Sequence, residues 1–378
     1  MKTVLSHLLK KRQAKRQPQR IHRRFLPDRW LVLATFALSL FGILMVYDSS
    51  VAIAIRDFSD QYFFVREQVK WLVLGYGVML LMIFFDYHRW YKLALPLLLL
   101  TLLALLAVFI PGLGVRALGA HRWLNLRFLI LQPAELAKLT LIIYLSAWFT
   151  GREKGRFTAF LLLLVMFFGL VIIEPDLGTG LIILGLSLAL YFFSGAALKN
   201  FALVLPLLFV GILLLAIVSP YRFARITSYL HPEKDPLGSS YQIRQVLIGL
   251  GSGGWTGVGI GQSRQKYEYL PEANTDSIFA IIGEETGFLG ALTIIVTYLV
   301  LVWRGFRIAK RAPDLFGRLL AAGISSWIGI QTLLNLAAMV ALIPLTGIPL
   351  PFISYGGSSL VIVLTGIGIL LNISRQKV

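Results

Sequence analysis

A polar loop that runs directly into an apolar helix holds the residues best suited to chemistry in this chain. The loop spans 269–277, and the apolar run that follows contains two adjacent acids, Glu284 and Glu285. Membrane helices rarely contain ionisable side chains unless these face a cavity or a partner. Asp276, the last acid before the apolar run, is therefore predicted to lie at a membrane surface. A polar head group and a lipid tail could be handled together at such a position.

A second charged motif opens the helix predicted over 133–150. Glu135 and Lys138 are three residues apart, so they share one helix face and can form an ion pair. Two interpretations stay open. The pair could face the interior of a helix bundle, or Lys138 could bind an anionic lipid head group together with Arg122 from the preceding loop.

Further cations are expected on the same side as Asp276. Arg244, Arg264 and Lys266 all lie in the long segment before Asp276. Negative charge that develops on a leaving group must be stabilised where it appears. Together with Lys138, these side chains could neutralise an anionic group near Asp276.

Three other segments carry turn or loop signals. Asp176 could cap the next helix through its carboxylate or help to position loops around a site. The glycine-rich run 251–261 lacks the Lys-Ser/Thr ending of a phosphate-binding loop, which favours a closely packed loop over a nucleotide site. The prolines and glycines of 348–359 predict a non-helical backbone, which a membrane tolerates only where it is buried in protein or lines a cavity.

The composition places these motifs in a membrane protein. Of 378 residues, 57% are hydrophobic, and the mean hydropathy is +0.77. Apolar runs of about 20 residues recur along the chain, which predicts an all-α polytopic membrane protein rather than a soluble one or a β-barrel. Cysteine is absent, which excludes disulfides and thiolate ligands. The net charge of +18 indicates basic cytoplasmic segments and anionic lipids, not nucleic acid.

About ten transmembrane helices are predicted after a basic cytoplasmic tail over 1–29. Residues 30–378 are expected to form a single transmembrane domain, with a large extracytoplasmic loop over 220–276 between the seventh and eighth helices. A shorter outer loop is expected over 111–132. The predicted helices cover 30–48, 69–86, 91–110, 133–150, 157–173, 178–194, 199–219, 277–303, 317–343 and 358–374.

The charges of the loops set the expected orientation. The outer stretches 174–177 and 344–357 contain no Lys or Arg, whereas the loops on the side of the tail are basic. Because positively charged loops stay in the cytoplasm, both termini are predicted to be cytoplasmic and the Asp276 loop to be extracytoplasmic. The five histidines are scattered and have no metal-ligand spacing.

Five collinear motifs resemble one family, the FtsW/RodA/SpoVE or SEDS proteins, over nearly the whole chain after the tail. The sequence at 263–266 and at 358–359 is more similar to that of the division branch, FtsW, than to that of the elongation branch, RodA. The motifs are Gln132-Pro133-Ala134-Glu135-Leu136, Pro175-Asp176-Leu177-Gly178-Thr179, Leu270-Pro271-Glu272-Ala273-Asn274-Thr275-Asp276, Gly283-Glu284-Glu285 and Pro351-Phe352-Ile353-Ser354-Tyr355-Gly356-Gly357-Ser358.

The resemblance implies a ten-helix peptidoglycan glycosyltransferase of the bacterial cytoplasmic membrane. Its substrate would be lipid II, an undecaprenyl-diphosphate-linked disaccharide-pentapeptide. The family's essential aspartate maps onto Asp276, whose carboxylate could accept the proton of the attacking sugar hydroxyl. A lone acid fits an inverting displacement, because a diphosphate leaving group needs charge neutralisation more than protonation. The residues expected to bind the substrate or its diphosphate are Arg122, Lys138, Arg244, Glu135, Glu272 and Ser354.

The same resemblance implies partners. These are a single-pass class B penicillin-binding protein that cross-links the nascent glycan, other membrane proteins of division or elongation, and membrane lipids. No cofactor is assigned, and the requirement for a divalent cation is left open.

The chain departs from the family pattern at several positions near these motifs. Asn274 stands where His is frequent, Ser277 where Phe is frequent, Ile130 where a basic residue is frequent, and Glu174 where Gln is common. A histidine-assisted proton relay is therefore not part of the expectation.

Two other classes of function compete with the polymerase. A lipid II flippase would need polar residues through the bundle to the cytoplasmic side, whereas the acids here cluster outside. A non-catalytic membrane scaffold of the division or elongation machinery would tolerate the loss of Asp276.

Overall fold

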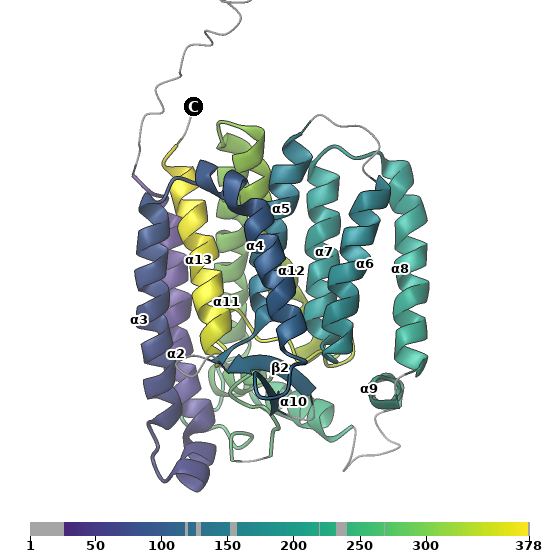
Figure 1. The fold of residues 1–378 in the computed structure, drawn as a ribbon. Coiled ribbons are helices and arrows are strands. Elements are labelled where there is room, and N and C mark those ends of the chain that lie inside the picture. The colour runs from purple at the N-terminus through teal and green to yellow at the C-terminus, as the bar shows by residue number, and fades with distance from the viewer. Residues whose placement is uncertain are drawn as a thin grey trace, which may run out of the picture.

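The computed structural model describes residues 26–117, 120–125, 130–151, 157–218, 220–231, 240–267 and 269–376. Most of them form a bundle of upright helices, and short strands and helices lie across one end of it (Figure 1). Residues 1–25 of the predicted tail lie outside the described part.

All ten predicted segments are helical. Among the described residues, six helices are long and apolar enough to cross a membrane: α2, α3, α4, α11, α12 and α13. Shorter apolar helices are α6, α7 and residues 198–208 of α8. The predicted all-α polytopic class is thereby confirmed. The bundle helices are α2 (Arg29–Phe58), α3 (Phe63–Phe84), α4 (His88–Ala107), α5 (Pro133–Thr150), α6 (Phe157–Ile173), α7 (Leu177–Phe193), α8 (Leu198–Val218), α11 (Ile278–Arg311), α12 (Leu315–Met339) and α13 (Gly357–Ser374).

The centre of the bundle is formed by the helices whose surfaces are mostly buried. α12 and α13 are largely buried, whereas α3 and α4 turn most of their apolar side chains outward. Helices that are apolar all round are expected where one face packs on protein and the other faces lipid.

The first helix is longer than its apolar core predicts. α2 continues ten residues beyond the expected end at 48 and stops at Ser59, whose φ of 54° is left-handed. Its 30 residues span about 45 Å, more than the roughly 30 Å of a hydrocarbon core. The helix therefore projects past the span at the same end as the Asp276 loop (Figure 1).

The two long loops that were predicted to be extracytoplasmic contain short strands and helices in their described residues. The first contains a three-stranded antiparallel sheet in the order β1 (Gly114–Ala117), β2 (Ala120–Asn125) and β3 (Ile130–Leu131). The second contains two short helices, α9 (Pro220–Leu230) and α10 (Tyr241–Ser252), at the end of the bundle as expected for interfacial segments. α9 is seen end-on in Figure 1, so it lies across the direction of the bundle.

Polar contacts fasten the opposite end of the bundle. Asp28, at the start of α2, pairs with Arg304 of α11, and its backbone N–H donates to Ser374 Oγ of α13 at 3.2 Å. The Tyr87 N–H donates to Asn372 Oδ1 at 3.1 Å. These bonds fix the helices that also frame the loop end.

Candidate functional site

Asp276 lies in the loop between α10 and α11 and is only 8% exposed. Its backbone carbonyl accepts a hydrogen bond from Asn335 Nδ2 of α12 at 2.8 Å. A Cβ atom built on Gly347 would lie 3.8 Å from Asp276 Oδ2 and 3.9 Å from Arg225 Nη1, so both side chains converge on the Gly347 backbone. Gly347 has a left-handed φ of 69°, which a side chain would disfavour.

The surroundings of Asp276 favour its neutral form more than water does. Burial raises the pKa of its carboxyl to about 7, the nearby charge of Glu272 acts in the same direction, and Arg225 opposes both. A carboxyl with a pKa close to the working pH can both accept and release a proton, which suits a general base.

Arg225, a residue that the sequence analysis missed, comes from α9. Its Nη1 donates to the Leu345 carbonyl at 2.7 Å. It also lines a cavity of about 40 Å³ together with Ser228, Tyr229, Gln242, Ile243 and Leu345. Gln242 Nε2 donates to Ser277 Oγ at 3.1 Å, which places this cavity beside the Asp276 loop.

The non-helical segment 344–356 between α12 and α13, called the broken segment here, packs against the Asp276 loop. Ser354 is 5% exposed, and its hydroxyl donates to the Thr275 carbonyl at 2.5 Å while accepting from the Leu350 N–H at 2.8 Å. The Tyr355 N–H donates to the Asn274 carbonyl at 2.9 Å. Ser354 thus bonds to one backbone group of the loop and to one of its own segment, which ties this segment to the loop.

Glu272 is an exposed residue of the same loop, and its Oε2 accepts from Thr275 Oγ1 at 2.8 Å. It is close enough to Asp276 to influence the pKa of that carboxyl, although the structure shows no direct bond between the two side chains.

Glu135 and Lys138 form the ion pair that their spacing predicts. Lys138 Nζ lies 2.7 Å from Glu135 Oε1 and donates to Gln331 Oε1 at 2.9 Å. Lys138 is fully buried, and its ammonium lies 5.3 Å from the ring centroid of Trp327. Gln331 in turn donates to the Pro349 carbonyl at 2.9 Å. The structure favours the interior ion-pair interpretation, with a connection to the broken segment under Asp276.

The loop between α6 and α7 contains the other predicted acid. Asp176 caps α7 by accepting from the Thr179 N–H at 3.0 Å, and the capping interpretation is confirmed. Arg122 Nε of β2 donates to the Glu174 carbonyl at 3.1 Å. Burial raises the pKa of Glu174 to about 8, with a contribution from Asp176 and an opposing one from Arg122.

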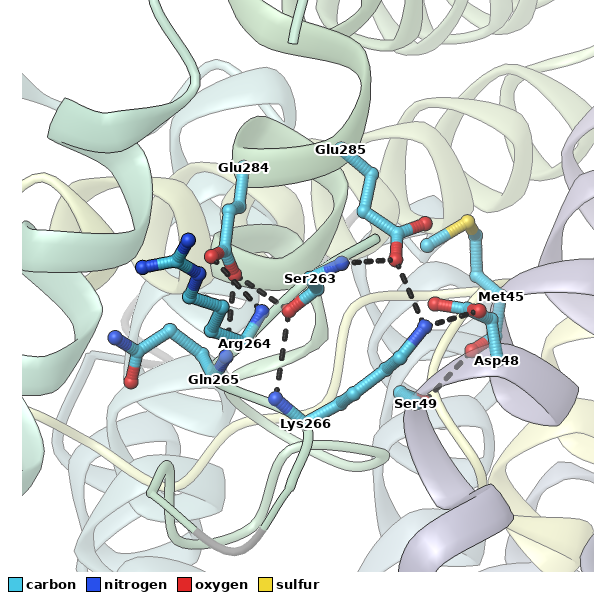
Figure 2. Close-up of polar contacts among 9 residues, drawn as sticks. All are labelled: Met45, Asp48, Ser49, Ser263, Arg264, Gln265, Lys266, Glu284 and Glu285. Atoms are coloured by element: carbon cyan, nitrogen blue, oxygen red, sulfur yellow. Dashed lines mark hydrogen bonds and ion pairs between the residues drawn. The ribbon is translucent and has the colours of Figure 1, made fainter. Parts of the chain in front are cut away.

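The cations of the long loop before α11 differ in exposure. Arg244 and Arg264 are exposed, whereas Lys266 is buried and bound to Asp48 and Glu285 (Figure 2). The expectation that Lys266 offers its charge to an anionic substrate is therefore wrong, because two carboxylates already hold it. Its partner Asp48 lies 218 residues away in sequence, so no local pattern could indicate the pair.

The glycine-rich run packs closely, as predicted. The Val258 N–H donates to the Glu284 carbonyl at 3.0 Å, and the Gly259 N–H to the Glu285 carbonyl at 3.1 Å. A Cβ on Gly257 would lie 2.0 Å from the Glu285 carbonyl oxygen. Within the described residues, no group of three or more His, Cys, Asp or Glu side chains could hold a metal ion.

Comparison with known proteins places this arrangement in a family. The family model described as "Cell cycle protein", FTSW_RODA_SPOVE, matches residues 29–378. The chain belongs to the FtsW/RodA/SpoVE family. The predicted resemblance is thereby confirmed.

Members of the FtsW/RodA/SpoVE family match the chain over almost their whole length. Stage V sporulation protein E of Bacillus subtilis is 41% identical over 93% of this chain and 98% of its own. A probable peptidoglycan glycosyltransferase FtsW of Geobacter sp. (strain M18) is 39% identical over 92% of this chain and 97% of its own. The FtsW-like sequence of the motifs is consistent with these names.

Solved structures show the same fold. A chain of a peptidoglycan synthase complex, studied for the coordination of polymerisation and crosslinking, superposes with a TM-score of 0.75 at 30% identity, covering 92% of this chain and 98% of that one. The rod shape-determining protein RodA of Thermus thermophilus gives a TM-score of 0.69 at 28% identity, covering 93% and 97%.

Proposed function

We propose that this protein is a peptidoglycan glycosyltransferase that polymerises lipid II into glycan strands during cell division or elongation. The single observation that carries the proposal is Asp276, a buried carboxyl whose pKa is raised to about 7 at the loop end of a membrane bundle. Relatives named probable peptidoglycan glycosyltransferases, which match over nearly their whole length, support the same reaction.

Asp276 serves as the general base in this proposal. It accepts the proton of the acceptor sugar's hydroxyl while that oxygen forms a bond to the anomeric carbon of the donor. The bond from that carbon to the diphosphate oxygen breaks, and its electron pair leaves with the undecaprenyl diphosphate. Attack from the face opposite the leaving group inverts the anomeric centre.

The leaving diphosphate needs positive charge, and we assign this role to arginines near the loop. Arg225 is the first candidate, because its side chain and that of Asp276 both approach Gly347 and its charge acts on the Asp276 carboxyl. Arg122 and exposed Arg244 remain further candidates from β2 and α10. Lys138 and Glu135 support the site from within the bundle through Gln331. Ser354 positions the loop, and Glu272 tunes the carboxyl of Asp276.

The proposed location is the bacterial cytoplasmic membrane, with both termini in the cytoplasm and the active site on the outer face. The start of α2 and the end of α13 lie at one end of the bundle, opposite the Asp276 loop (Figure 1). The end of α11 nearest these termini carries Arg304, Arg307, Lys310 and Arg311, in agreement with the positive-inside rule.

A class B penicillin-binding protein is the proposed partner. The support is the similarity to a chain of a peptidoglycan synthase complex that coordinates polymerisation and crosslinking. Other division or elongation proteins and membrane lipids complete the proposed environment.

Two assays on the purified protein test the function. Fluorescent lipid II is supplied with and without the cognate transpeptidase, and glycan length is measured. The same protein in liposomes is tested for movement of lipid II between leaflets. Long glycan without accelerated movement is expected. Movement of lipid II without glycan synthesis would indicate a flippase instead of a polymerase. Absence of both activities with the partner bound would indicate a scaffold.

A further inference from the structure

A buried ionic cluster closes the loop that carries Asp276 (Figure 2). The cluster binds residues 263–266, which are called the neck of the loop. At the centre is Lys266, which is 2% exposed. Its Nζ lies 2.7 Å from Asp48 Oδ1 of α2 and 3.1 Å from Glu285 Oε1 of α11. One ammonium thus joins the loop to two membrane helices.

The acids of α11 also bind the backbone of the neck. The Ser263 N–H donates to Glu285 Oε1 at 3.0 Å, and the Arg264 N–H donates to Glu284 Oε1 at 3.1 Å. The Ser263 hydroxyl donates to Glu284 Oε2 at 2.5 Å. Residue 263, before Asp276, is therefore bonded to residue 285, after it, and the chain between them forms a closed loop.

The cluster depends on its single lysine. Within the described residues, Asp48 Oδ2 and Glu285 Oε2 are buried without a hydrogen-bond partner. Burial would lower the pKa of Lys266, but its contacts with Asp48 and Glu285 outweigh burial and raise that pKa, so the side chain stays charged. Removing one partner from a buried ion pair leaves the other charge uncompensated, which is strongly destabilising.

α2 touches the neck and one other anchor of the loop. The other anchor is the broken segment, whose Ser354 binds the Thr275 carbonyl. A Cβ on Gly42 of α2 would lie 2.5 Å from the Phe352 carbonyl oxygen, which shows how closely α2 meets that segment. Asp48, further along the same helix, holds the neck through Lys266.

We propose that Lys266 is a positioning residue for the glycosyl transfer. By pairing with Asp48 and Glu285 it fixes the neck of the 263–285 loop against α2 and α11, and thereby holds the carboxyl of Asp276 in place without touching the substrate. The inference rests on the proposed function of Asp276.

The test compares Lys266→Met with Asp48→Asn, which keeps the shape of the side chain, and with Lys266→Arg, which keeps the charge. The matched control is Lys70→Met, because Lys70 pairs with Glu67 at 2.6 Å on the exposed surface of α3. Turnover and KM for lipid II are measured in the full-length protein with its partner. Hydrogen exchange of the backbone over 269–277 is measured in the same samples.

Lys266→Met is expected to lower turnover about 100-fold with KM nearly unchanged, since a misplaced catalytic group costs about that much. Exchange over 269–277 should become at least about tenfold faster, because a buried ionic contact no longer closes the neck. Asp48→Asn should shift both quantities in the same direction, and Lys266→Arg should lose less than Lys266→Met. The double variant Asp48→Asn/Lys266→Met should be no worse than Lys266→Met, because the two residues act as one unit.

Two results would overturn the inference. Unchanged exchange with unchanged turnover in Asp48→Asn and Lys266→Met would show that the cluster positions nothing. Lower turnover with a raised KM and unchanged exchange would show that Lys266 binds the substrate. If Lys266→Met does not fold, Asp48→Asn and Lys266→Arg decide by the same two readouts. If the wild type fails to polymerise lipid II, the proposed function fails, and the exchange data still decide whether Lys266 fixes the loop.

Discussion

Asp276 combines burial with one opposing cation, and this balance sets its protonation. Its pKa is raised from 3.8 to about 7, mainly by burial. Because the folded-state pKa is the higher one, ionisation disfavours the folded state, and stability that is present below about pH 4 is lost as the pH rises through 7. Asp276 therefore lowers the stability of the folded state at neutral pH, and its raised pKa lets the carboxyl bind and release a proton there.

The rate of polymerisation should rise with pH through about 7, because only the ionised carboxyl can accept a proton. Arg225→Gln should move this rise to higher pH, since Arg225 stabilises the carboxylate. Glu272→Gln should move it to lower pH, since Glu272 acts in the opposite direction. Initial rates across pH 5–9 check both shifts, and a midpoint that is identical in all three proteins would contradict the assignment.

At the scale of single elements, α11 is interrupted where the glycine-rich loop packs on it. Gly287 has φ 65° and ψ −167°, a conformation that separates the segment carrying Glu284 and Glu285 from the long membrane helix. The Phe288 N–H donates to the Gly254 carbonyl at 2.9 Å, so the loop takes over a backbone bond at the break. The interruption therefore gives the two acids their own orientation towards the neck.

Gly287→Ala should destabilise the protein, because its Cβ would lie 2.3 Å from the Gly257 nitrogen in a left-handed conformation. A loss of at least about 2 kcal/mol is expected in the free energy of unfolding. Gly169→Ala is the control, since a Cβ there meets nothing within 4 Å, and it should gain up to about 1 kcal/mol. Thermal unfolding in detergent measures both, and equal midpoints would show that the break is not required.

At the scale of the whole molecule, the sequence predicts the bundle well because long apolar runs determine where helices cross a membrane. It also predicts the Glu135–Lys138 pair and the Asp176 cap, which depend only on neighbours within one helical turn. The predicted C-terminal ends of α2 and α11, at 48 and 303, are too early, because both helices continue beyond their apolar cores.

Contacts between distant segments could not be predicted in this way. Lys266 was predicted to contribute positive charge for an anionic group near Asp276, but Asp48 binds it across 218 residues. Arg225 was missed, because only the folded chain brings α9 to Gly347 and Asp276. Spacing shows which residues share a helix face, but it does not show what that face meets.

The most direct measurement compares the rate of lipid II polymerisation by Asp276→Asn with that by Asp57→Asn, each with the partner transpeptidase bound. Both variants replace an aspartate carboxylate with an amide, but Asp57 lies exposed near the C-terminal end of α2 and pairs with Arg56. We expect Asp276→Asn to form no long glycan at any pH, whereas Asp57→Asn should match the wild type. Equal polymerisation by the two variants would contradict the assignment of Asp276 as the base.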